Sequence, residues 1–353
     1  MLLEGKRILI TGGTGSLGQT LVRRILKGEL GRPKKVIVFS RDEAKQHEMR
    51  MRYLNKRAAT DDVIYRKVVE TLQFQIGDVR DYSSISSALR DADVVFNAAA
   101  LKQVPTCEYF PYQAVLTNIV GPQNIVRSIT EQGLPVEVVV GISTDKACKP
   151  VNVMGMTKSI QERIFITANL QCQHTRFVCV RYGNVLASRG SVIPLFHEQI
   201  RNGGPLTITT PEMTRFLLSL DHAVDTVFAA VRDAKPGETY IPRVPATRVV
   251  DVAEALIGDR PIQTVATGIR PGEKVHEVLV SDEERHRTVD RGSYYAIMPI
   301  LPELRTEADP RICLDEEYSS SRDLMNKEEL RDLLREHGLL MDQNAAAEEE
   351  LLR

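Results

Sequence analysis

The sequence contains little cysteine, and the arrangement of its cysteines excludes the usual cysteine-based sites. The five cysteines among 353 residues are odd in number and show no CxxC or Cys/His metal spacing. The histidines His197 and His276 also lack metal-ligand partners at useful spacing. We therefore expect reduced thiols in a cytoplasmic protein, and no metal. The cysteines are Cys107, Cys148, Cys172, Cys179 and Cys313.

An excess of charge of either sign is lacking too. Lys and Arg number 46 against 47 Asp and Glu, which excludes an overall field that would draw the chain to nucleic acid or to an anionic membrane. No apolar run reaches the roughly 18 residues that a transmembrane helix needs. The start "MLLEGKRILITGG" leaves no room for a signal peptide before its glycine turn. We expect a soluble protein in which a local cluster of cations binds any anionic ligand.

Short β-branched segments alternate with longer segments of helical period through the first half of the chain. This alternation predicts an α/β fold with a doubly wound parallel sheet of the Rossmann type. We expect strands at 7–11, 35–39, 74–78, 93–99, 136–143 and 175–183, and helices at 16–28, 118–132 and 219–234.

After about residue 183 the pattern becomes irregular and richer in Gly and Pro, which is typical of binding loops on a smaller lobe. Asn326, Glu329 and Gly338 predict the N-cap, capping box and end of a late helix. The expected division is a nucleotide-binding domain at 1–183 with 219–240 packing back on it, an interleaved ligand-binding lobe at 184–218 and 241–340, and a tail at 341–353.

A glycine pattern between the first strand and the first helix predicts a dinucleotide site. Gly12, Gly15 and Gly18 form GxxGxxG, and Ser16 and Leu17 lie at the helix start, where backbone N–H groups bind a pyrophosphate. This spacing resembles that of the short-chain dehydrogenase/reductase superfamily.

The end of the second strand indicates which dinucleotide is bound. Ser40 and Arg41, with Lys45 following, match the 2′-phosphate of NADP. An acid directly after this strand would instead hold the free 2′-hydroxyl of NAD, and Asp42 stands nearby. We predict NADP in preference to NAD.

The segment "STDKACKPVNVMGMTK" carries the candidate catalytic residues. Thr144, Asp145 and Lys146 follow a predicted strand, at whose carboxyl end such sheets keep their chemistry. Met154 and Lys158 are four residues apart on one face of a helix. In the superfamily this pair is Tyr and Lys. Lys158 can still hold the nicotinamide ribose, but Met154 accepts no proton.

Further motifs extend the resemblance along the chain. They are "SRDEAKQHEMR", "AALKQVPTCEYFP", "NIVGPQNI", "RYGNVLASRGSVIPLF", "MTRFLLSL" and "GIRPGEKVHE". To about residue 337 the chain resembles the UDP-N-acetylglucosamine 4,6-dehydratases of bacterial polysaccharide synthesis, the CapD-like group. It is similar to the inverting, 5-epimerising branch of that group, which also has methionine in place of the tyrosine.

The resemblance implies two sets of ligand-binding residues and a homo-oligomer, with a hexamer among the forms it allows. The cofactor set adds Asp78, Val79, Ala98, Ala99, Ala100, Lys102, Asn118 and Lys158. The UDP-sugar set is Lys102, Asn184, Ser188, Arg189, Ser191, Thr207, Arg215, Arg270 and Glu273. Within it, Arg215 and Arg270 are expected at the diphosphate and Glu273 at the uridine ribose.

In the implied reaction, oxidation at C4 makes the C5 proton acidic. Lys146 removes that proton, Asp145 protonates the departing C6 hydroxyl, and the hydride returns to C6. Replacing H5 from the opposite face gives UDP-2-acetamido-2,6-dideoxy-β-L-arabino-hex-4-ulose. We expect the nicotinamide and Lys158 to lower the pKa of Lys146 so that it acts as a base. Thr144, Lys146 and a water held by them are the candidates for removing the O4 proton.

Two alternatives stay open at this point. A UDP-sugar 4-epimerase would return the hydride to C4 and need no elimination, so Asp145 and Lys146 would be idle. A non-catalytic NADP-binding scaffold would have no reason to keep Asp145, Lys146, Lys158 and Arg270 together.

Overall fold

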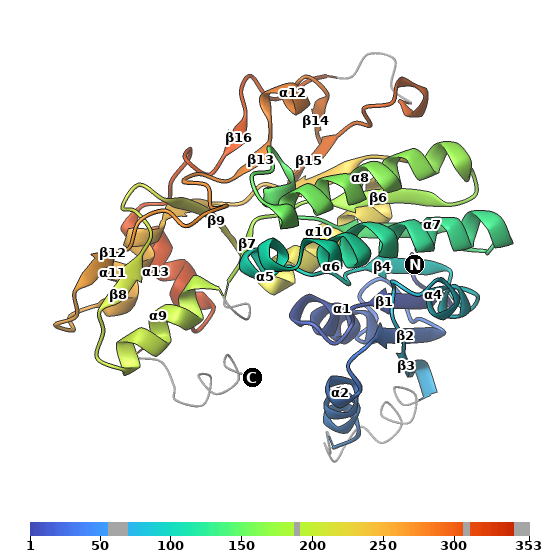
Figure 1. Cartoon of the computed structure of the whole chain (residues 1–353), viewed down its shortest axis with the longest axis horizontal. Coiled ribbons are helices and arrows are strands. Elements are labelled where there is room, and N and C mark those ends of the chain that lie inside the picture. The colour runs from blue at the N-terminus through green and yellow to red at the C-terminus, as the bar shows by residue number, and fades with distance from the viewer. Residues whose placement is uncertain (56–69, 187–190, 306–310, 342–353) are drawn as a thin grey trace.

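A nine-stranded sheet forms the centre of the molecule (Figure 1). The computed structural model describes residues 1–55, 70–186, 191–305 and 311–341. The strand order is β14-β15-β10-β6-β5-β4-β1-β2-β3, parallel from β3 to β10 and antiparallel at β15 and β14. The strands are β1 (Arg7–Thr11), β2 (Lys35–Ser40), β3 (Leu72–Ile76), β4 (Val94–Asn97), β5 (Val138–Ile142), β6 (Arg176–Val180), β10 (Thr239–Pro242), β14 (Thr288–Asp290) and β15 (Tyr294–Ile297).

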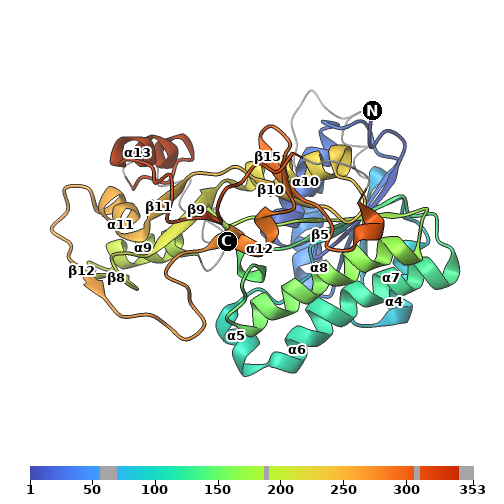
Figure 2. The ribbon, with the colours of Figure 1, turned by 90° about the horizontal axis from the view of Figure 1, so that it is seen from above.

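Helices cover both faces of this sheet, as Figure 2 shows from above. On one face lie α1 (Ser16–Leu26) and α10 (Leu220–Asp233), and on the other lie α4 (Tyr82–Leu89), α7 (Gly121–Gln132) and α8 (Val153–Gln171). Because neighbouring residues of a strand point to opposite faces, Ile8 and Ile10 join one apolar core while Leu9 joins the other. The sheet is therefore buried from both sides, and its loops are left to carry polar chemistry.

Shorter elements complete the larger lobe. Helix α2 (Glu43–Asn55) follows β2, and α5 (Val104–Tyr109), α6 (Pro111–Val115) and a π-helical turn η1 (Leu116–Val120) connect β4 to α7. A 3-10 turn η2 (Asp145–Ala147) connects β5 to α8. Further on are α12 (Asp282–Arg285) and a 3-10 turn η3 (Pro302–Leu304).

A smaller lobe has a separate apolar core around Phe196, Ile200 and Leu256. Its helices are α9 (Val192–Arg201), α11 (Val249–Ile257) and α13 (Lys327–Glu336). Its strands are β7 (Asn184–Val185), β9 (Thr214–Leu218) and β11 (Ala246–Arg248) in one sheet, and β8 (Leu206–Ile208) with β12 (Thr264–Ala266) in another. The strands β13 (Val278–Val280) and β16 (Tyr318–Ser319) pair with each other.

The α/β fold with a large parallel sheet is confirmed, and the six expected strands of the first half are β1 to β6. The capping box of Asn326 and Glu329 at the start of α13 is also present. Helix α10 packs against α1, β5 and β6. The strands β14 and β15 fall in the range assigned from the sequence to the smaller lobe, but they pair with β10 in the large sheet. The predicted tail lies, apart from Met341, outside the described residues.

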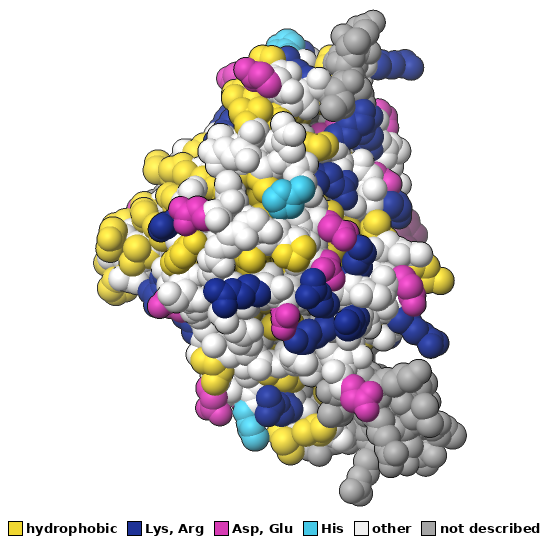
Figure 3. All heavy atoms as spheres, turned by 90° about the vertical axis from the view of Figure 1, so that its right-hand side faces the viewer, with side chains coloured by type: hydrophobic (Ala, Val, Ile, Leu, Met, Phe, Trp, Pro, Cys, Tyr) yellow, Lys and Arg dark blue, Asp and Glu magenta, His cyan; other side chains and the backbone are white. Residues whose placement is uncertain are grey.

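Charge of both signs is mixed on the face drawn in Figure 3, which agrees with the even composition. Across the described residues, none of the helices is both long and apolar enough to cross a membrane.

Candidate active site

The turn between β1 and α1 is shaped by glycines. Gly12 has φ +67°, in the region that favours glycine, and a Cβ there would lie 2.8 Å from the Ala98 carbonyl oxygen. A Cβ on Gly18 would lie 2.5 Å from Cα of Gly13. Helix α1 has no acidic residue in its first turn, and its N-cap Gly15 makes no side-chain cap. The first N–H groups of α1 therefore have no acidic or side-chain capping partner, and this glycine cradle (residues 12–18) stays the predicted pyrophosphate site.

The predicted 2′-phosphate residues lie together at the end of β2. Ser40 Oγ accepts a hydrogen bond from Gln46 Nε2 at 3.0 Å. The Arg41 guanidinium is about half exposed and lies 3.9 Å from the Asp78 carboxylate, and Lys45 Nζ lies 2.9 Å from Asp42. Arg41 and Lys45 thus both lie just after the end of β2, each beside a carboxylate. The preference for NADP stays a prediction.

The loop after β4 is held by Asn118, which is fully buried in the π-helical turn. Asn118 Oδ1 accepts from the Leu101 backbone N–H at 2.8 Å, and Nδ2 donates to the Leu101 carbonyl at 2.9 Å and to Thr157 Oγ1 at 3.0 Å. These bonds give Asn118 a positioning role for the loop after β4, whose Ala98 and Ala99 lie close to Gly12. Val79, in the segment between β3 and α4, is buried, whereas Lys102, in the loop after β4, is exposed.

The predicted acid and base meet directly after β5. Asp145 is fully buried, and its Oδ1 accepts from Thr144 Oγ1 at 2.8 Å and from Lys146 Nζ at 3.0 Å. Its Oδ2 has no hydrogen-bond partner among the described residues. The Asp145 N–H donates to the Tyr182 carbonyl at 3.0 Å, which ties the turn to the segment after β6.

A second carboxylate, which the sequence reasoning missed, completes this group. Glu277 is 2% exposed, and its Oε1 lies 3.1 Å from Lys146 Nζ and 4.0 Å from Arg215 Nε. Burial lowers the pKa of Lys146, but the Asp145 and Glu277 carboxylates raise it further, so that it lies above the ordinary value. Arg215 lowers this pKa as well, but the net direction from the chain's own residues is upward, whereas the sequence led us to expect a lowering by Lys158 and the nicotinamide. Glu277 is the last residue of the motif "GIRPGEKVHE", and this motif was the sequence signal that could have identified it.

Helix α8 presents Met154 and Lys158 as its four-residue spacing predicts. Met154 packs in an apolar cluster with Cys107 and Ala114, and its thioether accepts no proton. Lys158 Nζ donates to Gln161 Oε1 at 2.6 Å, and burial lowers the pKa of Lys158 to about 8. This lysine is fixed in direction by Gln161, which itself donates to the Ile142 carbonyl at 3.1 Å.

The segment 268–277 of the smaller lobe closes over the catalytic turn. Lys274 Nζ donates to the Cys148 carbonyl at 2.5 Å, and Asn152 Nδ2 donates to the Gly272 carbonyl at 2.7 Å. Asn152 also caps α8 by accepting from the Gly155 N–H at 2.8 Å. The two lobes therefore meet at the residues that position Lys146 and α8.

The described members of the predicted UDP-sugar set, apart from Lys102, lie in the smaller lobe. Arg215 is buried and donates to the Thr214 and Val275 carbonyls, whereas Arg270 is exposed. Glu273 Oε2 accepts from Thr209 at 3.4 Å, and Thr207 Oγ1 accepts from Gln199 at 2.7 Å. Asn184 Oδ1 and Ser191 Oγ are buried without a partner in the part of the chain that is described. Ser188 and Arg189 lie outside the described residues.

A buried cluster of ion pairs lies beside the turn that carries Asp145 and Lys146. The Arg181 guanidinium donates to Glu162 Oε2 at 2.6 Å and to Glu284 Oε2 at 2.7 Å, and Glu162 also accepts from Ser143 Oγ at 2.5 Å. This cluster connects β5, the segment after β6, α8 and α12.

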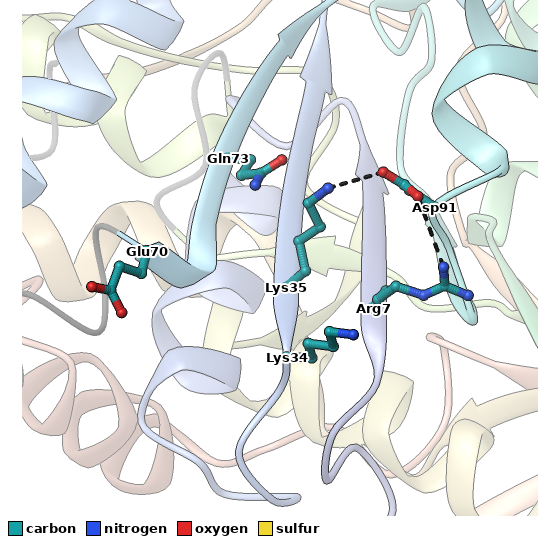
Figure 4. Close-up of a pocket in the computed structure, with 6 residues that line it drawn as sticks. All are labelled: Arg7, Lys34, Lys35, Glu70, Gln73 and Asp91. Atoms are coloured by element: carbon teal, nitrogen blue, oxygen red, sulfur yellow. Dashed lines mark hydrogen bonds and ion pairs between the residues drawn. The ribbon is translucent and has the colours of Figure 1, made fainter.

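A hollow of about 310 Å³ lies at the amino ends of β1, β2 and β3, at the opposite end of the strands from the catalytic turn (Figure 4). There Lys35 and Arg7 lie on either side of Asp91, at 3.0 and 3.8 Å. The amino ends of the strands are far from the catalytic turn at their carboxyl ends, so this hollow is separate from the site. Across the described residues, no group of three or more His, Cys, Asp or Glu could hold a metal.

The family described as "Polysaccharide biosynthesis protein" matches residues 8–299. The chain belongs to this family. A UDP-glucose 4-epimerase of Rickettsia bellii (strain OSU 85-389) is 42% identical over 340 residues, covering 93% of this chain and 95% of the relative.

Solved structures agree with the fold. Pen from Bacillus thuringiensis superposes with a TM-score of 0.85 at 34% identity, over 97% of this chain and all (100%) of that one. DesIV from Streptomyces venezuelae, a dTDP-glucose 4,6-dehydratase with NAD and TYD bound, has a TM-score of 0.62 at 20% identity, over 76% of this chain and 86% of that one. At that identity the likeness shows the fold alone.

Proposed function

We propose that this chain is an NADP-dependent UDP-N-acetylglucosamine 4,6-dehydratase that also inverts C5. The observation that carries this proposal is the hydrogen-bonded Asp145–Lys146 pair directly after β5, beside Met154 where a proton-accepting tyrosine would otherwise lie. Elimination of water needs an acid at O6 and a base at C5, and this pair supplies one of each. Membership of a polysaccharide biosynthesis family supports a role in surface polysaccharide synthesis.

The residues around the turn would divide the work as follows. A nicotinamide cofactor in the glycine cradle would supply hydride acceptance from C4 and hydride return at C6. Lys158, held by Gln161, would bind its ribose. After Lys146 has passed its resting proton to Asp145, the neutral amine of Lys146 removes the C5 proton, whose acidity comes from the C4 ketone, and Asp145 protonates the departing C6 hydroxyl. Thr144 keeps Asp145 oriented through its 2.8 Å hydrogen bond.

The substrate lobe would bind the UDP group. Arg215 and Arg270 are the proposed diphosphate ligands, because guanidinium groups bind phosphate in two-point contacts. Asn184 and Ser191 have buried oxygens that the described residues leave unpartnered, so both are available to a ligand hydroxyl. A buried polar oxygen without a partner costs free energy, which a bound sugar would relieve.

A UDP-sugar 4-epimerase is the second candidate, and the name of the 42% identical Rickettsia relative favours it. Epimerisation at C4 returns the hydride to the same carbon. It therefore needs a proton acceptor for O4 but no acid at C6, so the Asp145–Lys146 pair favours the dehydratase.

Incubation with UDP-N-acetylglucosamine in deuterated water separates the candidates. A dehydratase that inverts C5 gives a 4-keto-6-deoxy product with deuterium at C5. An epimerase gives a galacto product without deuterium, and a scaffold gives neither. Detection of the galacto product alone, by nuclear magnetic resonance, would refute the proposal.

The role of Lys146 is tested by Lys146→Ala. This variant should lose turnover and keep cofactor binding, because Lys158 and the glycine cradle are untouched. Lys149→Ala is the matched control, since the Lys149 side chain is 43% exposed and pairs with Glu317. A dehydratase rate retained in Lys146→Ala would show that another group is the base.

A further inference from the structure

The proposed reaction requires more proton-accepting capacity than Asp145 and Lys146 provide. Two protons leave the sugar, one from O4 and one from C5, and two protons are delivered, one to the departing C6 hydroxyl and one to C5. If Lys146 first gives its proton to Asp145, the pair becomes one acid and one neutral amine. That amine can hold only one proton at a time, and Met154 accepts none. A second acceptor is therefore needed before H5 is removed.

Glu277 lies where such an acceptor would have to be. Its Oε1 is 3.1 Å from Lys146 Nζ, the same atom that lies 3.0 Å from Asp145 Oδ1. The carboxylate is 2% exposed, and its Oε2 has no hydrogen-bond partner within the described part of the chain. Glu277 can therefore take up a proton at Oε1, the atom 3.1 Å from Lys146 Nζ, and its Oε2 loses no hydrogen bond within the described part of the chain.

The backbone of Glu277 is fixed, which holds the carboxylate against Lys146. The Glu277 N–H donates to Ser320 Oγ at 2.9 Å, and the Ser320 N–H donates to the Glu277 carbonyl at 2.8 Å. Ser320 Oγ is in turn 2.7 Å from Thr214 Oγ1. These contacts bring a residue of the smaller lobe into the catalytic turn of the larger one.

The charged groups around Lys146 and Glu277 come from three elements. Asp145 lies on the 3-10 turn, Arg215 on β9 approaches Glu277 at 4.0 Å, and Lys274 shares the segment before β13. The neighbouring His276 hydrogen-bonds Thr214 Oγ1 at 2.8 Å and is exposed. Among the residues that the structure describes, Glu277 and Asp145 are the two carboxylates within hydrogen-bond reach of Lys146 Nζ.

On the basis of the proposed function, we propose that Glu277 receives the O4 proton through Lys146. Lys146 passes its resting proton to Asp145, accepts the O4 proton, and hands it to Glu277 Oε1. Neutral again, Lys146 takes H5 while Asp145 protonates O6 and water departs. C5 then receives a proton from solvent on the face opposite Lys146, while Lys146 releases its own proton to solvent, so that C5 is inverted. Glu277 returns its proton to Lys146, and the three groups regain their resting charges. Glu277 acts only through Lys146 and does not need to touch the sugar.

Replacement of the acceptor by an amide tests this relay. With UDP-N-acetylglucosamine, Glu277→Gln should lower kcat about 100-fold or more and leave KM within about twofold, a size typical of lost acid–base catalysis. Its kcat should rise about tenfold per pH unit between about pH 6 and 9, because Lys146 must now lose a proton to solvent. The wild-type kcat should be nearly flat there, since Glu277 accepts the O4 proton from Lys146 without solvent. Glu277→Asp keeps a carboxylate and should recover part of kcat and the flat profile.

A pre-steady-state measurement distinguishes this role from a structural one. Glu277→Gln should slow the first appearance of reduced cofactor, because O4 deprotonation accompanies C4 oxidation. Asp282→Asn, whose exposed carboxylate pairs with Lys149 at 3.5 Å, is the control and should match the wild type. Cofactor reduction at the wild-type rate, or a loss of kcat with an unchanged pH profile, would overturn the proposal. Circular dichroism shows whether Glu277→Gln folds. If it does not fold, cofactor reduction and the pH profile of kcat are measured on Glu277→Asp instead. A wild-type rate of cofactor reduction together with a steep pH profile in Glu277→Asp would overturn the proposal.

Failure of the proposed function can be recognised separately. The wild-type product in deuterated water establishes whether elimination occurs. If only a galacto product forms, the dehydratase proposal is wrong, but Glu277 is still tested by cofactor reduction, because C4 epimerisation also needs the O4 proton removed.

Discussion

Replacement of Arg181 by methionine should strongly destabilise the larger lobe. The guanidinium is 2% exposed and lies between the carboxylates of Glu162 and Glu284, at 2.6 and 2.7 Å. It also donates to the Leu279 carbonyl at 2.8 Å. Arg181→Met keeps most of the volume and leaves two buried carboxylates without their cation.

The size of the loss follows from the pKa of Glu284. Burial raises this pKa, but Arg181 lowers it further, and the result is a pKa of about 2 against an ordinary value of 4.5. A difference of roughly 2.5 units corresponds to about 3.4 kcal/mol of stability. Breaking a buried ion pair by removing one partner costs about 3–5 kcal/mol. We therefore expect Arg181→Met to lower the free energy of unfolding at neutral pH by about 3–5 kcal/mol.

The pH dependence has a definite sign. Because the folded-state pKa of Glu284 is depressed, its contribution is fully present above the unfolded value of 4.5 and is lost as the pH falls toward about 2. The stability difference between wild type and Arg181→Met should therefore shrink over that range.

Urea unfolding followed by circular dichroism measures the loss. Arg232→Met is the control, because Arg232 pairs with Asp233 at 2.7 Å with both side chains exposed, at 58% and 43%. That variant should lose less than about 1 kcal/mol. A loss below about 1 kcal/mol in Arg181→Met would refute the reasoning, since it would mean that the two carboxylates are not held by Arg181.

Three further substitutions test the cradle, the turn and α8. Gly18→Ala would place a Cβ 2.5 Å from Gly13 Cα, so cofactor affinity, measured by fluorescence titration, should fall about tenfold through overpacking. Gly155→Ala would clash with the Lys146 carbonyl oxygen, so kcat should fall about 100-fold with cofactor affinity kept; unchanged kcat would contradict this. Burial lowers the pKa of Lys158 to about 8 from an ordinary value of 10.5. The buried charge therefore lowers the free energy of unfolding below pH 8, and this destabilisation disappears as the pH rises from about 8 to 10.5. Lys158→Met should therefore have a higher free energy of unfolding than the wild type at neutral pH. Urea titrations should show this difference shrinking by roughly 3 kcal/mol as the pH rises through that range.

Local patterns were sufficient to predict much of the larger lobe. The β-branched runs became β1 to β6 because parallel strands are buried on both faces and so read as continuous apolar segments. The glycine spacing predicted the cradle, since Gly12 and Gly18 leave no room for a Cβ. The strands β14 and β15 were misplaced because short antiparallel edge strands follow the irregular part of the chain and carry no distinctive period.

The candidate site was predictable where its residues are neighbours in sequence. Asp145 with Lys146, and Met154 with Lys158, follow from one segment and one helix face. Glu277 was not predicted, because it is 131 residues from Lys146 and only the packing of the two lobes brings them to 3.1 Å. The same holds for Arg181, which meets Glu284 only through the fold.

The sequence by itself determined which chemical groups are present: a glycine turn, an acid next to a lysine, and a methionine that cannot accept a proton. The tertiary structure decided the electrostatics of these groups. Lys146 lies between two carboxylates and its pKa is raised, whereas Lys158 is buried beside an amide and its pKa is lowered. Charge interactions depend on distance and burial, which neighbours in sequence do not specify.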